Sequence, residues 1–400
     1  MTAPLESIVV IHYLELALKG RNRSWFVHTL VRTIRLVLKD LDVRETRLET
    51  GRILVHLRPD ADWVDVRARI ARIPGIANFG FAVTVPPDVG AMGDAIVARL
   101  GGRAPASFRI KARRADKRFP IPSPEIEREI GRRVQETAGW RVDLSDPALT
   151  IHVEVLTGRA LVFFEREAGA GGLPIGTGGR VLCLISGGID SPVAAWRLIR
   201  RGCRARFVHF HAYPIVSRAS IDKVREIVAV LTRHQLRSRL FLVPFGTVQQ
   251  RVVISVPPPM RIVIYRRLML RIAERIAERA GAGALVTGDV IGQVASQTLE
   301  NLAVVSQAST QLLLRPLAGC DKGEITAEAV RLGTYDVSIR PDDDCCSLFA
   351  PPMPVTRARI EQALEAEAGL DVEALVAEAL EGVTVEDFRY PVINSAVANV

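Results

Sequence analysis

The residues best suited to chemistry in this 400-residue chain form the string Ser186-Gly-Gly-Ile-Asp-Ser191. The apolar segment 181–185 precedes the string and predicts a buried strand. Pro192 after it favours the first turn of a helix, with Ser191 as its N-cap. Two adjacent glycines let the backbone turn N–H groups inward, and a helix N-terminus behind them attracts anions. The string therefore predicts a phosphate-binding loop.

Asp190 lies inside this loop and is the candidate for a catalytic and metal-binding role. A carboxylate repels phosphate unless a cation lies between them, so we expect Asp190 to hold Mg²⁺ against the phosphates. A glycine turn between a strand and a helix is also common for purely structural reasons, but the whole string is far more specific than the turn. No Gly-Lys-Ser/Thr follows it, which excludes a Walker A loop.

A second chemical feature is a run of cations at 109–118, interrupted by one acid, Asp116. Strand alternation puts the first three cations on one face, as binding to a phosphate backbone requires. Charges that deter the pairing of an edge strand are the alternative explanation. No aromatic series accompanies the run, which favours recognition of shape and backbone over base stacking. The candidate RNA-binding residues are Arg109, Lys111, Arg113, Arg114, Lys117 and Arg118.

Cys345 and Cys346 form a third feature, directly after three aspartates in a proline-bounded loop. Neighbouring carboxylates raise a thiol pKa, so the local sequence does not explain a reactive thiol. The pair either carries sulfur as a persulfide, pairs with an external thiol, or is incidental to the loop. The lack of a C-x-x-C motif or an adjacent histidine gives little support to zinc. Five cysteines in total fit a reducing compartment.

The glycine-rich segment 168–180 separates two unlike halves and reads as a linker. Before it, we expect two small α+β domains, at 1–72 and 73–167. After it, short apolar strands alternating with helices predict a doubly wound parallel sheet over 181–400. The predicted strands are 5–14, 52–57, 79–85, 107–113, 149–155, 160–166, 181–185, 205–211, 239–243 and 285–287, and the predicted helices are 21–41, 63–73, 88–101, 123–138, 191–201, 219–233, 260–280 and 321–332.

The composition agrees with a soluble protein that has a polyanionic partner. The net charge is +9 and hydrophobic residues make up 48% of the chain. The sequence has no run of about 18 apolar residues, so we expect no membrane span. His12 and Glu15 interrupt the apolar N-terminal segment, so we expect no secretory signal and a cytoplasmic location.

Together these strings resemble the tRNA 4-thiouridine synthetase (tRNA sulfurtransferase, ThiI) family over essentially the whole chain. The first unit resembles its ferredoxin-like domain, the second its THUMP domain, and the last a PP-loop ATP pyrophosphatase with a Rossmann-like fold. The matching strings are Ala17–Gly20, Asn22–Phe26, Ile73–Ile76, Lys111–Pro120, Gly172–Thr177, Ser186–Ser191, Val286–Asp289, Gly292–Leu302, Arg315–Leu317 and Asp321-Lys322.

The resemblance implies an ATP-dependent reaction on uridine 8 of tRNA. ATP would activate O4 as an adenylate with release of pyrophosphate, a persulfide sulfur would attack C4, and AMP would leave. Cys345 matches the catalytic thiol, and Asp190 would act through Mg²⁺. The implied ATP contacts are Leu184, Ile185, Ser186, Gly187, Gly188, Asp190, Ser191, His209, Phe210, Arg266, Gly288 and Gln297.

Some relatives carry a C-terminal rhodanese-like domain, and we expect none here. The sulfur donor is therefore expected to be a separate cysteine desulfurase acting on Cys345 or Cys346. A sulfur-carrier protein of thiamine thiazole synthesis and a homodimer stay open. The rival hypotheses are another PP-loop reaction, such as 2-thiolation or amide ligation, and an RNA-binding module with a vestigial ATP site. The cation run disfavours the ligase, and the intact loop disfavours the vestigial site.

Overall fold

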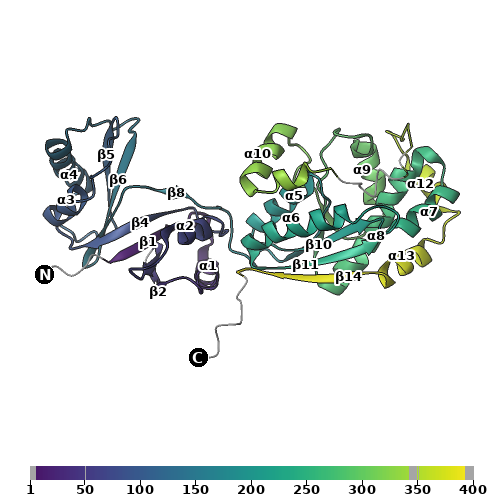
Figure 1. The fold of residues 1–400 in the computed structure, drawn as a ribbon, viewed down its shortest axis with the longest axis horizontal. Helices are drawn as coiled ribbons and strands as arrows, with labels where there is room; N and C mark the ends of the chain where they lie inside the picture. The colour runs from purple at the N-terminus through teal and green to yellow at the C-terminus, as the bar shows by residue number, and fades with distance from the viewer. Residues whose placement is uncertain (1–5, 50, 342–348, 350, 392–400) are drawn as a thin grey trace, which may run out of the picture. The chain divides into compact units, whose positions relative to one another are not determined.

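The computed structural model describes residues 6–49, 51–341, 349 and 351–391. The chain divides into two compact units, Met1–Gly172 and Leu173–Val400, which Figure 1 draws in purple to blue and in teal to yellow. Within the described ranges, no helix has both the length and the apolar character needed to cross a membrane.

The first unit is built on a single eight-stranded sheet with the order β2-β3-β1-β4-β7-β6-β5, and β8 pairs with β4. The two predicted small domains therefore share one sheet. Its strands are β1 (Ser7–His12), β2 (Val43–Glu49), β3 (Arg52–Leu57), β4 (Asn78–Val85), β5 (Phe108–Arg114), β6 (Leu149–Leu156), β7 (Arg159–Phe163) and β8 (Glu167–Ala168). The helices are η1 (Glu15–Leu18), η2 (Gly20–Asn22), α1 (Arg23–Val37), α2 (Trp63–Ala71), α3 (Val89–Val97) and α4 (Ser123–Ala138).

Helix α4 shows how local sequence sets these elements. Proline stands in its first turn, and Gly139 ends it in the left-handed conformation at φ 67°. Ile126, Ile130 and Val134 recur every four residues and are fully buried against the sheet. This apolar stripe holds α4 beside β5, the strand that carries the cation run.

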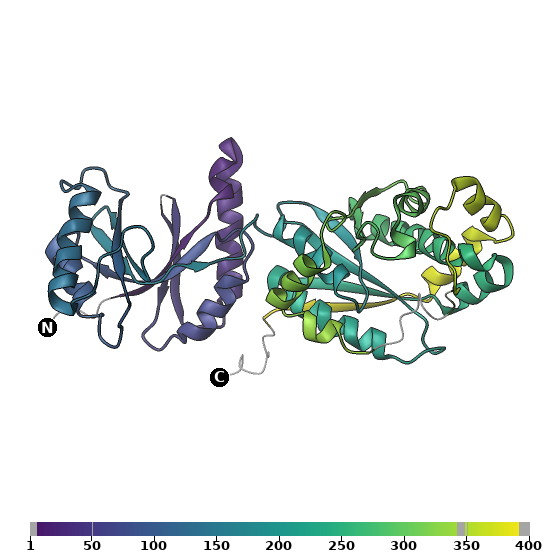
Figure 2. The ribbon, with the colours of Figure 1, turned by 90° about the horizontal axis from the view of Figure 1, so that it is seen from above.

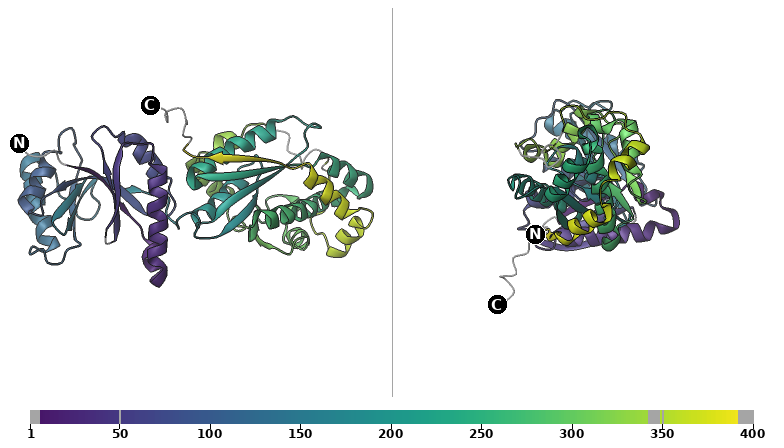
Figure 3. Two further views of the ribbon diagram at one scale, coloured as in Figure 1. Left: turned by 90° about the horizontal axis from the view of Figure 1, so that it is seen from below. Right: turned by 90° about the vertical axis from the view of Figure 1, so that its right-hand side faces the viewer.

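The sheet of the first unit is strongly curled. Four inter-strand steps of about 4.8 Å would separate β3 from β6 by about 19 Å in a flat sheet. Nevertheless, Arg52 Nη1 of β3 lies 2.5 Å from Glu154 Oε2 of β6, and both side chains are buried. Figure 3 shows the helix pairs α1–α2 and α3–α4 on the two outer sides, with the strands between them. Strand β5 lies at the edge of this sheet.

The second unit is a six-stranded sheet with the order β13-β12-β9-β10-β11-β14 and helices on both faces (Figure 2). Its strands are β9 (Arg180–Leu184), β10 (Arg204–His211), β11 (Arg237–Pro244), β12 (Ala284–Val286), β13 (Leu312–Leu314) and β14 (Thr384–Arg389). Its helices are α5 (Asp190–Arg200), α6 (Ala219–Gln235), α7 (Gly246–Ser255), η3 (Pro258–Met260), α8 (Arg261–Ala280), η4 (Ala295–Gln297), α9 (Leu299–Ser306), α10 (Lys322–Leu332), α11 (Tyr335–Ser338), α12 (Ile360–Glu367) and α13 (Val372–Glu381).

This sheet confirms the predicted doubly wound architecture and adds one antiparallel strand. Strands β9 to β13 pair in parallel, whereas β14 runs antiparallel to β11 at the edge. From β9, the chain adds β10 and β11 on one side and then β12 and β13 on the other. The order therefore reverses between β9 and β12, and such a switch point is where open α/β sheets bind ligands.

The predicted linker is tied closely to its surroundings. Gly75 N donates to Gly171 O at 2.7 Å, and Gly176 N donates to Gly202 O at 2.8 Å. A Cβ on Gly178 would lie 2.7 Å from Arg201 O, so only glycine fits against that turn. The predicted linker is therefore hydrogen-bonded to, or packed against, neighbouring residues along most of its length.

Candidate functional site

The loop Ser186–Ser191 connects β9 to α5 at the switch point of the second sheet. Ser186 N donates to Ser191 Oγ at 2.9 Å, and Ser191 Oγ donates to Ser186 O at 3.2 Å. Gly188 N approaches Ser186 Oγ at 3.4 Å. The two serine side chains therefore close the loop on itself.

One detail of the sequence prediction is wrong at this point. Helix α5 begins at Asp190, and the preceding Ile189 provides no side-chain cap. Ser191 lies inside the first turn and binds back to the loop. The hydroxyl that was expected to cap the helix instead stabilises the turn, because its donor partner is the Ser186 amide.

Gly288, just beyond β12, packs against the start of α5. A Cβ at this position would lie 2.8 Å from both the N and Cα atoms of Ser191 and 3.0 Å from the carbonyl carbon of Asp190. These are backbone atoms, which cannot rotate away. The contact therefore requires a glycine at position 288, and it sets the distance between the phosphate loop and the end of β12.

Asp190 makes two polar contacts across the loop. Lys322 Nζ lies 2.9 Å from its Oδ1, and Gln293 Nε2 donates to its Oδ2 at 2.9 Å. Lys322 follows Asp321, which is the N-cap of α10 within a capping box. The loop thus brings together a helix N-terminus and a lysine, two features that attract anions.

The described residues form no ready-made metal site. No group of three or more histidine, cysteine or acidic side chains converges anywhere in the described ranges. Among the residues that the structure describes, Asp190 provides the carboxylate at the loop. Mg²⁺ commonly binds through one or two carboxylates together with substrate phosphates. The residues therefore fit an ion that arrives with a polyphosphate.

Beneath the loop lies a cavity of about 330 Å³, within the usual range for small-molecule sites. Every predicted nucleotide contact except Gly187, which is buried, lines this cavity. Sequence reasoning missed other lining residues, namely Val208, Ile262, Met269, Thr287, Asp289, Val294 and Ser296. The cavity therefore combines a polar rim at the loop with apolar walls from β10 and α8.

Asp289 holds together the polar wall of the cavity. Its Oδ1 accepts from Arg266 Nη2 at 2.5 Å, and its Oδ2 accepts from Thr287 Oγ1 at 2.7 Å and Arg315 Nε at 3.1 Å. Burial raises the pKa of Asp289, but Arg266 and the other donors outweigh this effect and lower the pKa overall. The carboxylate is therefore charged and fully engaged.

Two histidines lie at the carboxyl end of β10. His209 Nδ1 lies 3.0 Å from Ile185 O and lines the cavity. Burial, with smaller contributions from His209 and Arg218, lowers the pKa of His211 to about 4. Both side chains are buried, and His211 is a neutral imidazole at physiological pH.

Cys345 and Cys346 lie outside the described residues. The described chain before them contacts the phosphate loop, where Ser338 Oγ donates to Gly188 O at 3.3 Å. The chain after them contacts α9, where Asn301 Nδ2 donates to Val355 O at 2.7 Å. Both flanks are therefore anchored to elements next to the cavity.

The cation run divides into three groups. Lys111, Arg113 and Lys117 are exposed. Arg109 donates to Thr150 Oγ1 and Leu144 O, each at 3.2 Å.

The remaining two cations bind within the unit. Arg114 donates to Phe119 O at 2.7 Å. Arg118 forms an ion pair with Asp116 at 3.0 Å, and this guanidinium lowers the pKa of Asp116. Because β5 is an edge strand, the charges of the run disfavour pairing with another strand and also present cations to solvent.

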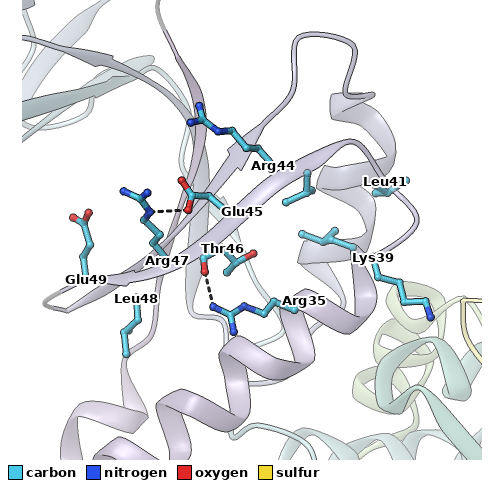
Figure 4. A pocket seen from close by; sticks show the side chains of 11 residues that line it. Arg35, Lys39, Leu41, Arg44, Glu45, Thr46, Arg47, Leu48 and Glu49 are labelled. Atoms are coloured by element: carbon cyan, nitrogen blue, oxygen red, sulfur yellow. Dashed lines mark hydrogen bonds and ion pairs between the residues drawn. The ribbon is translucent and has the colours of Figure 1, made fainter.

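A larger hollow of about 690 Å³ lies between α1 and β2 (Figure 4). Its arginines already contact the protein: Arg35 Nη2 donates to Thr46 O at 2.8 Å, and Arg47 Nε to Glu45 Oε2 at 2.8 Å. Arg44 approaches Glu6 Oε1 at 3.4 Å. These partners explain the charges, so we assign no ligand to this hollow.

Each of the three parts of the chain matches a known protein family. Residues 8–80 match the ThiI ferredoxin-like domain, 91–165 the THUMP domain, and 176–372 the family described as thiamine biosynthesis protein (ThiI). These matches agree with the types of domain expected, and the exact domain boundaries stay a prediction.

Individual proteins match over nearly the full length. A probable tRNA sulfurtransferase of Thermus thermophilus is 48% identical over 97% of this chain and 95% of its own. One from Brevibacillus brevis is 40% identical over 95% of this chain and 96% of its own. A solved 4-thiouridine synthetase, in complex with RNA and with bound ATP, has a TM-score of 0.86 and 35% identity over 96% of this chain and 100% of that one.

Proposed function

Because this chain belongs to the tRNA sulfurtransferase (ThiI) family, we propose that it uses ATP to place sulfur at C4 of uridine 8 in tRNA, forming 4-thiouridine. The observation that carries the proposal is the cavity under Ser186–Ser191, which is lined by nearly all the residues expected to contact ATP. The 4-thiouridine synthetase that shares this fold was solved with ATP and RNA, which supports both ligands.

The first proposed step is adenylation of the target base. Uridine O4 attacks the α-phosphorus of ATP, pyrophosphate leaves, and the N3 proton is lost. The α5 N-terminus and Lys322 stabilise the charge that develops on the departing pyrophosphate. Mg²⁺, when bound with the nucleotide, would add positive charge there, and Asp190 is the residue that would hold it.

The second proposed step is sulfur transfer. The terminal sulfur of a persulfide attacks C4, and the C4–O4 bond breaks, so AMP leaves with the original oxygen. A cysteine desulfurase supplies the persulfide. The attack leaves C4 joined to the protein as C4–S–S–Cys, with Cys345 or a neighbouring cysteine as the carrier. The thiolate of the other cysteine attacks the carrier's sulfur, the S–S bond breaks, 4-thiouridine leaves and takes up a proton, and the two cysteines form a disulfide that an external thiol reduces for the next turnover. Supply of sulfur to a carrier protein for thiamine thiazole synthesis, and a homodimeric assembly, are further parts of the proposal.

The proposed RNA contact is the exposed face of β5. Lys111 and Arg113 project from an edge strand whose opposite face packs on α4. A row of cations at strand spacing matches a row of phosphates and carries no sequence information by itself. Target choice would therefore depend on the shape of the tRNA and on access of the base to the cavity.

Mass analysis of nucleosides tests the function directly. The protein is incubated with unmodified tRNA, ATP, Mg²⁺, a cysteine desulfurase and cysteine, and the tRNA is then digested. We expect 4-thiouridine, formed only when ATP is present. A 2-thiouridine product would establish the rival thiolation, and tRNA binding without any thionucleoside would favour the vestigial site.

A matched pair of variants tests the role of the loop. Asp190→Asn should lower the thiolation rate by about 10²-fold or more, because both the lysine contact and the proposed ion site lose their charge. The Kd for tRNA should change by less than about twofold, as expected away from the RNA surface. Asp387→Asn serves as the control. Asp387 lies on β14, and the substitution breaks its ion pair with Arg239, in which Nε lies 2.8 Å from Oδ1. Equal rates for the two variants would remove Asp190 from the mechanism.

A further inference from the structure

Asp289 and Gln297 suggest how the cavity discriminates between nucleotides. Asp289 is the third residue after the end of β12 and is 4% exposed. Gln297 ends the short helix η4 and lines the same cavity. Gln297 Nε2 lies 3.4 Å from Asp289 Oδ1, the oxygen that also accepts from Arg266.

The charge of Asp289 determines which way the Gln297 amide faces. An ionised carboxylate can only accept hydrogen bonds, so every neighbour must present a donor to it. The pKa of Asp289 is lowered because Arg266, Thr287 and Arg315 together outweigh its burial. The NH₂ group of Gln297 must therefore face Asp289, and its Oε1 must face away. This assignment rests on electrostatics and not on the shape of the amide, which is nearly symmetric.

The oxygen that results has no partner within the protein. Gln297 Oε1 is buried and accepts no hydrogen bond from any described residue. A buried acceptor left unsatisfied costs about 1–3 kcal/mol. A ligand in the cavity that offers a donor at this point would remove that cost, and one that offers an acceptor would not.

Arg266 is held by the same carboxylate. Its Nη1 donates to Ser296 O at 2.7 Å, next to Gln297 in sequence. The guanidinium thus links α8, η4 and the end of β12 through Asp289. Loss of the carboxylate would free both the arginine and the amide that line the cavity.

We propose that Asp289 is a positioning residue that fixes Gln297 as a hydrogen-bond acceptor for a donor of the bound nucleotide, so that Gln297 determines nucleotide specificity. The donor is the amino group of adenine or the 2′-hydroxyl of the ribose, which share this chemistry. The inference rests on the proposed function, since it requires the nucleotide to occupy this cavity.

The test measures binding of ATP, of purine riboside triphosphate, which lacks the amino group, and of 2′-deoxyATP. The wild-type protein should bind one analogue about tenfold more weakly than ATP, as the loss of one buried hydrogen bond implies. Gln297→Leu should bind ATP and that analogue equally. Asp289→Asn should also lose the discrimination, although Gln297 is still present. The analogue that shows the effect identifies the donor.

A control separates this effect from the loss of any buried ion pair. Glu367 accepts hydrogen bonds from Arg267 and Arg271 of α8 and does not line the cavity. Glu367→Gln should keep the wild-type discrimination.

Three results would overturn the inference: equal binding of all three nucleotides by the wild type, undiminished discrimination in Gln297→Leu, or undiminished discrimination in a folded Asp289→Asn. Gln297→Leu removes no charge and keeps the test decisive if Asp289→Asn does not fold. A wild-type protein that binds no ATP would instead contradict the proposed function.

Discussion

Substitution of Gly288 by alanine should disable the phosphate loop while leaving the rest of the second unit intact. The added Cβ would lie 2.8 Å from the N and Cα atoms of Ser191. A methyl carbon normally rests about 3.5–4.0 Å from another carbon, so the loop must retreat by roughly 1 Å. Both neighbours are backbone, so no side-chain rotation can relieve the contact.

The size of the effect follows from this displacement. A misplacement of about 1 Å at a reacting centre costs on the order of 10²-fold in rate. Overpacking by one methyl group costs about 1–3 kcal/mol of stability, which a domain of this size should tolerate. We therefore expect a folded variant with a rate of 4-thiouridine formation about 10²-fold lower in single-turnover assays. Urea denaturation monitored by circular dichroism would report its stability.

Gly283→Ala is the matched control at the other end of β12. A Cβ at Gly283 meets nothing within 4 Å, and its φ lies outside the left-handed region. Its stability should therefore change by less than about 0.5 kcal/mol, with unchanged activity. Wild-type turnover by Gly288→Ala would refute the argument that this contact sets the position of the loop.

Three further perturbations follow from the structure. Replacing Lys111 and Arg113 together with alanine should weaken tRNA binding and lower the slope of log K against log salt by roughly 1–2, because two phosphate contacts are lost. Cys345→Ser should block thiolation more strongly than Cys346→Ser, as nucleoside analysis would record. Burial, and then Arg166, lower the pKa of His152 to about 4. Neutral His152 contributes to the stability of the folded state above pH 6.5, and this contribution is lost as the pH falls to 4. His152→Gln should therefore reduce the change in the free energy of unfolding between these two pH values by up to about 3 kcal/mol.

Each of these experiments has its own control. Arg132→Ala on α4 removes an exposed cation that already pairs with Glu129 and Glu136, so the salt slope should not change. An unchanged slope in the double variant as well would place the RNA elsewhere. The reverse order of the two cysteine variants would reassign the thiol. His28 is exposed on α1, and His28→Gln serves as the control for a histidine-to-glutamine substitution as such.

Sequence patterns predicted the central strands of each sheet and the edge strand β5, but missed the edge strands β2, β13 and β14. Strand β9 carries a continuous apolar run, and β10 is buried from Phe207 to His211, as is typical of central parallel strands. Strands β2 and β14 read Val-Arg-Glu-Thr-Arg-Leu-Glu and Thr-Val-Glu-Asp-Phe-Arg, and each pairs on one side only. Their stability comes from contacts distant in sequence, such as Arg225 with Glu386 at 2.6 Å, which no local pattern encodes.

The site divides in the same way. The phosphate loop was predictable because its residues are adjacent in sequence and their spacing dictates the turn. The other cavity residues came from the family resemblance, since no periodicity marks Arg266 or Gln297. Asp289 was missed as a functional residue because its partners Arg266 and Arg315 lie 23 and 26 positions away. An acidic residue three positions beyond a buried strand was the signal that could have found it.

The contact between Asp190 and Lys322 helps to explain how one carboxylate can serve a phosphate site. Lys322 is half exposed, and an exposed ion pair contributes about 0–1 kcal/mol, so nucleotide binding can break it at little cost. A nucleotide that arrives with a cation would give Asp190 a new partner and release Lys322 toward the phosphates. The same two side chains would then neutralise each other in the empty loop and stabilise the polyphosphate in the occupied one. A strong buried pair could not make this exchange, so the exposure of Lys322 is itself part of the proposed mechanism.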